Sequence, residues 1–206
     1  MFVKICGLTR PQDVRDAVAA GAQAIGFIAF PKSPRYVSPE DVEKLSKDIP
    51  RNILKVAVFV NEDPDVLREY LAVGIDVLQL HGSETAEYAK SLSAEAEIWR
   101  ALRLKEESEI AEFIDFPCSR FVIDAYVKDA VVPGGTGHRA DWSLSKSFVA
   151  ASKVPVILAG GIKKESVKQA VAQVDPWGLD LSSGVELSPG VKSQEMIDAF
   201  FEELNS

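Results

Sequence analysis

Residues 154–181 read VPVILAGGIKKESVKQAVAQVDPWGLDL, and this stretch decides the fold class. It opens on a nearly continuous apolar run that ends at a glycine pair, which predicts a buried strand followed by a turn. One apolar helix face follows, at the i, i+3, i+4 and i+7 positions Val167, Ala170, Val171 and Val174. A second strand is predicted at 178–182. Strand, helix and strand in this order indicate the βα repeat of a parallel sheet.

The same alternation continues along the whole chain. The predicted strands cover residues 2–6, 24–30, 54–60, 77–81, 98–102, 121–125, 154–160 and 178–182. Three helix-to-strand junctions resemble one another, at 18–27, 71–80 and 171–181. Eight such strands, each followed by a helix, predict an α/β protein with a single (β/α)₈ (TIM) barrel domain over residues 1–206. The alternative, a doubly wound sheet, normally has five or six strands, and its GxGxxG turn does not follow the first strand.

Composition narrows the classes of function. A chain of 206 residues with 47% hydrophobic content can bury one sizeable core. Its two cysteines, Cys6 and Cys118, and its two histidines, His81 and His138, are too scattered to predict a disulfide framework or a metal site. No apolar run approaches membrane-spanning length and no signal peptide is visible, so a cytoplasmic protein without membrane contact is predicted.

The charge and the surface pattern bear on partners. A net charge of −8 argues against a nucleic-acid partner, whereas a small phosphorylated substrate stays compatible because backbone N–H groups can hold a phosphate. No surplus apolar face is visible in the sequence. A monomer is therefore the default expectation, with a homodimer as the alternative.

The chemically distinctive residues fall at one rim of the predicted barrel. In this fold the chemistry lies at the carboxyl ends of the strands and in the loops that follow them. Cys6, His81, Asp124 and Asp180 end strands one, four, six and eight, and Arg35 lies in the loop after strand two. The loops after strands seven and eight, the usual phosphate-binding pair, contain Gly160, Gly161, Ser182, Ser183 and Gly184.

Each of these residues also has a structural interpretation. Cys6 can be a small apolar filler, because free cysteine is often buried. Arg35 can be a surface residue, His81 a hydrogen-bonded core histidine and Asp124 a helix cap. Cys118 precedes strand six at the opposite face and is interpreted as structural.

Several motifs together resemble one family. "KICGLT" at 4–9, "SPR" at 33–35, "QLHG" at 79–82 and "SSGVE" at 182–186 occur in the order found in phosphoribosylanthranilate isomerases, the barrel enzymes of tryptophan biosynthesis. "FVIDA" and "LAGGI" match as well, and the resemblance covers nearly the whole chain. Ala140 and Ser193 depart from the family's usual phenylalanine and aspartate, both at peripheral positions.

The resemblance implies an Amadori rearrangement of N-(5-phosphoribosyl)anthranilate to 1-(2-carboxyphenylamino)-1-deoxyribulose 5-phosphate. An acid opens the ribose ring and a base then removes the C2 proton, so no metal or organic cofactor is expected. By family correspondence Cys6 is the base and Asp124 the acid. The acid must hold a proton, which predicts a raised pKa for Asp124 in a desolvated site.

The resemblance also implies the substrate contacts. Arg35 is expected to meet the anthranilate carboxylate, Asp180 the anthranilate nitrogen, and His81 to support the site from beside it. The phosphate is expected at the N–H groups of the loops after strands seven and eight, which hold Gly160, Gly161, Ser182, Ser183 and Gly184. Gly135, in the "GGTG" segment at 134–137, is assigned to a lid, and Gly7 is expected to make room for the substrate.

Three alternatives share this framework. The related Amadori isomerase of histidine biosynthesis would have an aspartate where this chain has Cys6. An indole-forming synthase would have lysine-rich strand ends. A catalytically silent phosphate-binding barrel would keep the glycine loops but have no need of Cys6 and Asp124.

Overall fold

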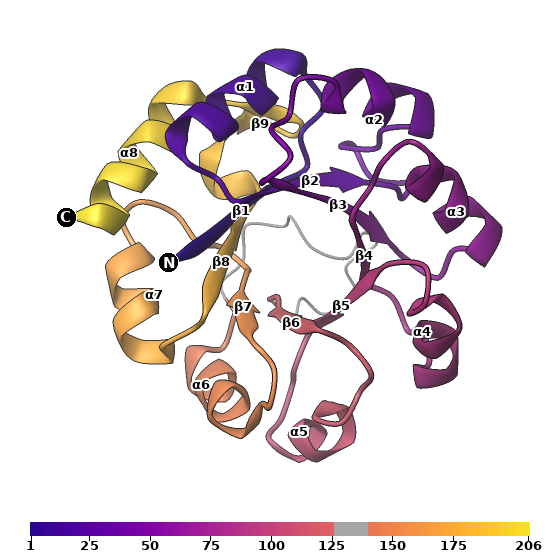
Figure 1. Cartoon of the computed structure of the whole chain (residues 1–206). Helices are drawn as coiled ribbons and strands as arrows, with labels where there is room; N and C mark the ends of the chain where they lie inside the picture. The colour runs from indigo at the N-terminus through magenta and orange to yellow at the C-terminus, as the bar shows by residue number, and fades with distance from the viewer. Residues whose placement is uncertain (126–139) are drawn as a thin grey trace.

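Eight parallel strands close into a barrel in the computed structural model, which describes residues 1–125 and 140–206. Each strand pairs with the next along the chain, and β8 pairs back with β1 (Figure 1). The strands are β1 (Phe2–Cys6), β2 (Ala24–Ile28), β3 (Leu54–Phe59), β4 (Val77–Leu80), β5 (Glu97–Leu102), β6 (Arg120–Ile123), β7 (Val156–Leu158) and β8 (Gly178–Leu181). The predicted (β/α)₈ fold is confirmed.

Helices surround the barrel as an outer layer (Figure 1). They are α1 (Pro11–Ala20), α2 (Pro39–Ser46), α3 (Pro64–Ala72), α4 (Ala86–Leu92), α5 (Ser108–Phe113), α6 (Trp142–Ala151), α7 (Val167–Val174) and α8 (Gln194–Asn205). At the start of α2 the Ser38 hydroxyl accepts a hydrogen bond from the Asp41 N–H, and Pro39 occupies the first helical position. Among the described residues, none of the helices has the length and apolarity needed to cross a membrane.

The barrel interior changes character along its axis. Its lower layers are filled by apolar side chains, among them Ala24, Val56, Val77, Trp99, Val122 and Ile157. Because strand residues alternate between the inside and the outside, residues two positions further along the same strands also point inward. Those positions include Gln79 and Asp124, which are buried, and Asp180 on β8 is buried as well. Polar groups therefore enter the interior toward the carboxyl ends of the strands, beside apolar side chains such as Val58 and Ala101.

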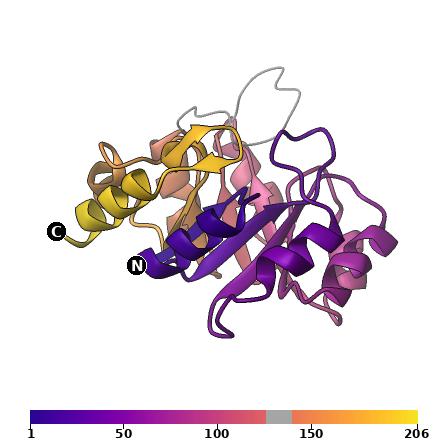
Figure 2. The ribbon, with the colours of Figure 1, turned by 90° about the horizontal axis from the view of Figure 1, so that it is seen from above.

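One element was not predicted from the sequence. After a short 3₁₀ turn, η1 (Ser183–Val185), the strands β9 (Glu186–Ser188) and β10 (Val191–Lys192) form an antiparallel hairpin outside the barrel. Figure 2 shows this hairpin and the loop after β2 at the same end of the molecule. The hairpin therefore adds a wall at the carboxyl-terminal rim.

Candidate active site

The first and last strands of the barrel bring Cys6 and Asp180 together. Cys6 ends β1 and is only 6% exposed, and Asp180 lies on β8 opposite Lys4 in the strand register. Lys4 precedes Cys6 by two residues and so points into the barrel on the same side. Its Nζ donates to Oδ2 of Asp180 at 2.7 Å. Two of the predicted residues thus share a buried cluster with a lysine that was not predicted.

His81 and Asp124 form the opposite side of the mouth. His81 follows β4 and Asp124 follows β6, and their Nε2 and Oδ2 atoms lie 3.4 Å apart. This is an electrostatic contact rather than an aligned hydrogen bond. The other carboxylate oxygen, Oδ1, accepts from the N–H of Ala125 at 2.7 Å. The structure therefore pairs two residues that the sequence placed only on the same rim.

The pKa expectation for Asp124 was wrong in direction. Burial alone would raise the pKa of this carboxyl group, but the contact with His81 and the Ala125 N–H outweigh burial and lower it. The sequence could not reveal that an imidazole stands beside the acid.

The Cys6 thiol lies among opposing influences. Burial raises its pKa above the ordinary value, while the nearby charges of Lys4 and Lys192 act in the lowering direction. The effect of burial is the larger one and the pKa of Cys6 is raised, so the thiol form predominates in the free protein at neutral pH. A thiolate at this position depends on the cations around it.

Arg35 is held at the rim by a buried ion pair. Its Nη2 lies 2.6 Å from Oε2 of Glu186, and its Nε donates to Oε1 at 2.9 Å. The arginine thus bridges the loop after β2 to the β9–β10 hairpin. An added side-chain carbon at Gly7 would lie 2.6 Å from Cδ of Arg35, so the absence of a side chain there makes room for the arginine.

Lys192, on the hairpin, links the hairpin to the barrel through three hydrogen bonds. Its Nζ donates to the carbonyl oxygens of Cys6 and Ser182, at 2.6 and 3.1 Å, and to Oε1 of Glu186 at 2.7 Å. Its side chain is fully buried. One cation thus fixes the ends of β1 and β8 and the carboxylate that holds Arg35.

The loops after β7 and β8 are packed directly against each other. An added side-chain carbon at Gly184 would overlap the carbonyl oxygen of Ile162, so only glycine permits this approach. Gly160 and Gly161 both have positive φ, at 77° and 66°. Within the described loops the N–H groups of Gly160, Gly161, Ser183 and Gly184 donate to no other backbone carbonyl. Gly135 lies outside the described residues.

Sequence reasoning missed Lys4, Glu186 and Lys192. Lys4 carried a signal, since a lysine two residues before Cys6 in a buried strand must share its inward face. Glu186 carried one as the last residue of the "SSGVE" motif. Lys192 carried none, because the hairpin that places it was not predicted.

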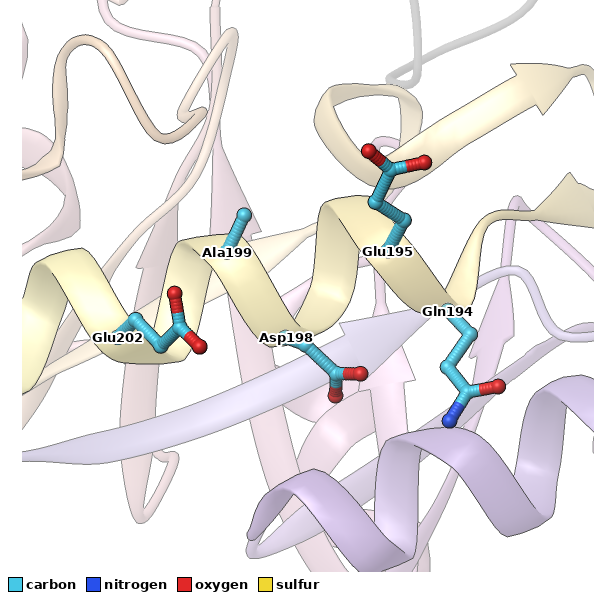
Figure 3. Close-up of a pocket in the computed structure, with 5 residues that line it drawn as sticks. All are labelled: Gln194, Glu195, Asp198, Ala199 and Glu202. Atoms are coloured by element: carbon cyan, nitrogen blue, oxygen red, sulfur yellow. The ribbon is translucent and has the colours of Figure 1, made fainter.

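Away from the rim, a shallow pocket lies on the outer face of α8 (Figure 3). It is lined by Gln194, Glu195, Asp198, Ala199 and Glu202, and Gln194 extends toward α1. These residues lie on the helical layer, outside the barrel mouth. In the described parts of the chain, no group of three or more histidine, cysteine or acidic side chains is arranged to hold a metal ion.

Solved structures resemble this chain over its full length. Phosphoribosyl anthranilate isomerase from Thermus thermophilus superposes with a TM-score of 0.91 at 35% identity, covering 100% of this chain and 98% of that one. An isomerase solved with reduced 1-(o-carboxyphenylamino)-1-deoxyribulose 5-phosphate has a TM-score of 0.87 at 32% identity, with the same coverage. Monomers generated from the dimeric Thermotoga maritima isomerase give 0.85 at 32%, again covering 100% and 98%.

Sequence comparisons agree with the structural ones. The family model described as N-(5'-phosphoribosyl)anthranilate (PRA) isomerase matches residues 3–203. The N-(5'-phosphoribosyl)anthranilate isomerase of Dechloromonas aromatica is 43% identical over 201 residues, which is 96% of this chain and 93% of that protein. The isomerase of Citrifermentans bemidjiense is 40% identical over 196 residues, or 95% and 92%. The chain belongs to the N-(5'-phosphoribosyl)anthranilate isomerase family.

Proposed function

We propose that this chain converts N-(5'-phosphoribosyl)anthranilate into 1-(2-carboxyphenylamino)-1-deoxyribulose 5-phosphate in tryptophan biosynthesis. The observation that carries the proposal is the placement of a thiol and a carboxyl group at the ends of β1 and β6, on opposite sides of the barrel mouth (Figure 1). A small sugar between Cys6 and Asp124 meets a base on one side and an acid on the other. Family membership identifies the reaction that uses such a pair.

The proposed reaction uses two residue-assisted proton transfers followed by a tautomerisation. Asp124 gives a proton to the ribose ring oxygen, the C1–O bond breaks, and the amine lone pair forms a Schiff base at C1. The Cys6 thiolate then takes the C2 proton, and the electron pair moves to neutralise the iminium nitrogen. The resulting enolamine becomes the ketone by gaining a proton at C1 and losing one from the C2 hydroxyl. Each of these steps moves only protons, so the proposed mechanism uses no cofactor.

His81 is proposed to position the acid. Its Nε2 lies 3.4 Å from Oδ2 of Asp124, and the Ala125 N–H donates to the other carboxylate oxygen, Oδ1, at 2.7 Å. These two contacts hold the Asp124 side chain at the barrel mouth, where the proposed mechanism needs it to deliver a proton to the ring oxygen.

The substrate is oriented by groups spread around the rim. Oδ1 of Asp180 is buried and has no hydrogen-bond partner among the described residues, which suits it to accept from the anthranilate N–H. Arg35 offers its guanidinium to the anthranilate carboxylate from its place against Glu186. Gly160, Gly161, Ser182, Ser183 and Gly184 line the two loops assigned to the phosphate.

Purified protein tests the activity directly. Because the substrate is unstable, it is formed in situ from anthranilate and phosphoribosyl pyrophosphate, and its conversion to the ketone is followed. Wild-type protein should consume the substrate, and Cys6→Ser should not. A folded wild-type protein that leaves the substrate unchanged would overturn the proposal and favour a silent phosphate-binding barrel.

Three broader properties belong to the same proposal. We assign residues 1–206 to one domain, because β1 and β8 close one barrel and α8 packs on α1. A monomer is proposed from the exposed apolar side chains. The large ones among the described residues are scattered along the chain: Met1, Tyr36, Trp177, Leu187 and Met196.

A cytoplasmic location is proposed because the base must stay a free thiol, as Cys6 is, and the cytoplasm keeps thiols reduced.

A further inference from the structure

Lys4 is a buried cation that the reaction as described does not use. Its side chain is 0% exposed, so water cannot solvate the ammonium group. Burial alone would lower the pKa of Lys4, but the charges and hydrogen bonds of Asp180 and Cys6 together outweigh burial and raise it, so the lysine remains protonated. A charged lysine buried so deeply destabilises the folded protein unless an opposite charge pairs with it.

The Lys4 side chain runs alongside the Cys6 thiol. Both cover the same spot above β2: a side-chain carbon added at Gly26 would lie 2.7 Å from Sγ of Cys6 and 3.0 Å from Cε of Lys4. The absence of a side chain at Gly26 gives these two groups a shared space. An ammonium group has three N–H donors, and Asp180 accepts one of them at 2.7 Å.

Other charged groups also act on the thiol. Lys192, at the end of β10, and Arg35, from the loop after β2, add positive charge near Cys6. Asp180 on β8 adds negative charge, and the His81–Asp124 pair lies across the mouth. Lys192 and Arg35 are both bound to Glu186, whereas Lys4 is bound to Asp180 and interacts directly with the Cys6 thiol.

We infer that Lys4 is a positioning residue whose ammonium group stabilises the Cys6 thiolate, and that Asp180 sets how much of that charge the thiolate receives. The inference rests on the proposed base role of Cys6. When the thiolate forms, the free N–H donors of Lys4 turn to the sulfur. When the thiolate takes the C2 proton, the sulfur becomes neutral and Lys4 remains paired with Asp180.

Alkylation of Cys6 tests this without any catalytic turnover. In a Cys118→Ala background Cys6 is the only cysteine, and its rate of reaction with iodoacetamide at a fixed pH below its pKa reports the thiolate fraction. Lys4→Met should slow alkylation about tenfold or more, the effect of removing an opposite charge at this range. Asp180→Asn should accelerate it, because Lys4 then has only the thiolate as anionic partner.

The alkylation rate should fall in Lys4→Met and rise in Asp180→Asn, and these opposite changes distinguish an electrostatic role of Lys4 from a structural one. Lys55→Met is the matched control, because Lys55 also lies on a strand and pairs with an aspartate, Asp76, but at the surface. This control should leave the alkylation rate unchanged. Equal rates in Lys4→Met and wild type, or changes in the same direction for Lys4→Met and Asp180→Asn, would overturn the inference.

A double variant covers a failure of Lys4→Met to fold. Lys4→Met/Asp180→Asn removes both charges, so no unpaired ion is left in the barrel. Its alkylation rate should lie below that of wild type, because the lysine acts on the thiol more strongly than the aspartate does. A rate equal to wild type would count against the inference.

The pH–rate profile links the thiolate to catalysis. In Lys4→Met the ascending limb of kcat against pH should shift upward by the amount that alkylation indicates, with recovery of rate at higher pH. A shift in alkylation without any shift in the profile would leave the Lys4 inference standing and show that Cys6 is not the base. The two failures are therefore distinguishable.

Discussion

At the scale of single residues, the site depends on which charges stand beside Cys6 and Asp124. Burial opposes ionisation of the thiol, and His81 opposes protonation of the carboxyl group. Each catalytic group is therefore biased toward the form that the reaction does not use, and the charge of Lys4 can offset this bias for the thiol. The pairing of His81 with Asp124 could not be read from the sequence, because it depends on which strand ends face each other, whereas Lys4 was signalled by its position two residues before Cys6.

Cys6→Ser should remove the base while preserving the shape of the site. We expect kcat to fall by about 10²–10⁴-fold, the usual contribution of a positioned base, with an unchanged free energy of unfolding. In the wild type, the raised pKa of Cys6 means that the thiolate fraction, and with it the rate of C2 deprotonation, should rise with pH toward that pKa. Steady-state kinetics across a range of pH measures kcat and its pH dependence, and urea unfolding measures the free energy of unfolding. Near-normal turnover in the folded variant would return Cys6 to a filler role.

Asp124→Asn should block ring opening. The amide keeps the shape but cannot deliver a proton, so kcat should fall by about 10²-fold or more while an open-chain product analogue binds nearly as tightly as to wild type. Calorimetric titration with the analogue separates binding from chemistry. Wild-type turnover in this variant would move the acid role to Asp180.

Arg35→Met should act mainly on KM. A contact with the anthranilate carboxylate persists through the reaction and so contributes uniform binding. Arg68→Met is the control, because Arg68 is a surface arginine paired with Glu95 on the helical layer. An unchanged KM with a large fall in kcat would assign Arg35 a different role.

At the scale of elements, strand positions were predictable and the hairpin was not. All eight strands lie within a residue or two of the predicted starts, because buried parallel strands leave apolar runs in the sequence. Their ends were predicted less well: β2 stops at Ile28 and β7 covers only Val156–Leu158. The β9–β10 hairpin is too short and too exposed to leave such a run, with Leu187 72% exposed. Because the hairpin was not predicted, the contacts of Glu186 and Lys192 were not predicted either.

Gly184→Ala should loosen the phosphate site without touching the reacting groups. The added methyl would overlap the carbonyl of Ile162 and push the loops after β7 and β8 apart. KM and the inhibition constant for inorganic phosphate should rise about tenfold, with kcat changed less. Ser183→Ala keeps every N–H group in place and should have little effect on either constant. Equal effects of both variants would show that the Ser183 hydroxyl matters.

At the scale of the whole molecule, we expect one copy of the chain in solution. Light scattering coupled to size-exclusion chromatography should give a mass close to 22.4 kDa across a hundredfold range of concentration. A mass near twice that value, stable on dilution, would establish the homodimer instead.

The pairing of β1 with β8 sets an order of events during synthesis. Lys4 and Asp180 are 176 residues apart, yet they share one ion pair inside the barrel. A ribosome makes Cys6 early and must translate nearly the whole barrel before β8 exists to meet it. Closing the barrel over so long a sequence separation is entropically costly and slow. The edges of β1 and β7 therefore stay unpaired until β8 has been made. The growing chain is therefore inert, and the base obtains its electrostatic surroundings only when the last strand joins the first.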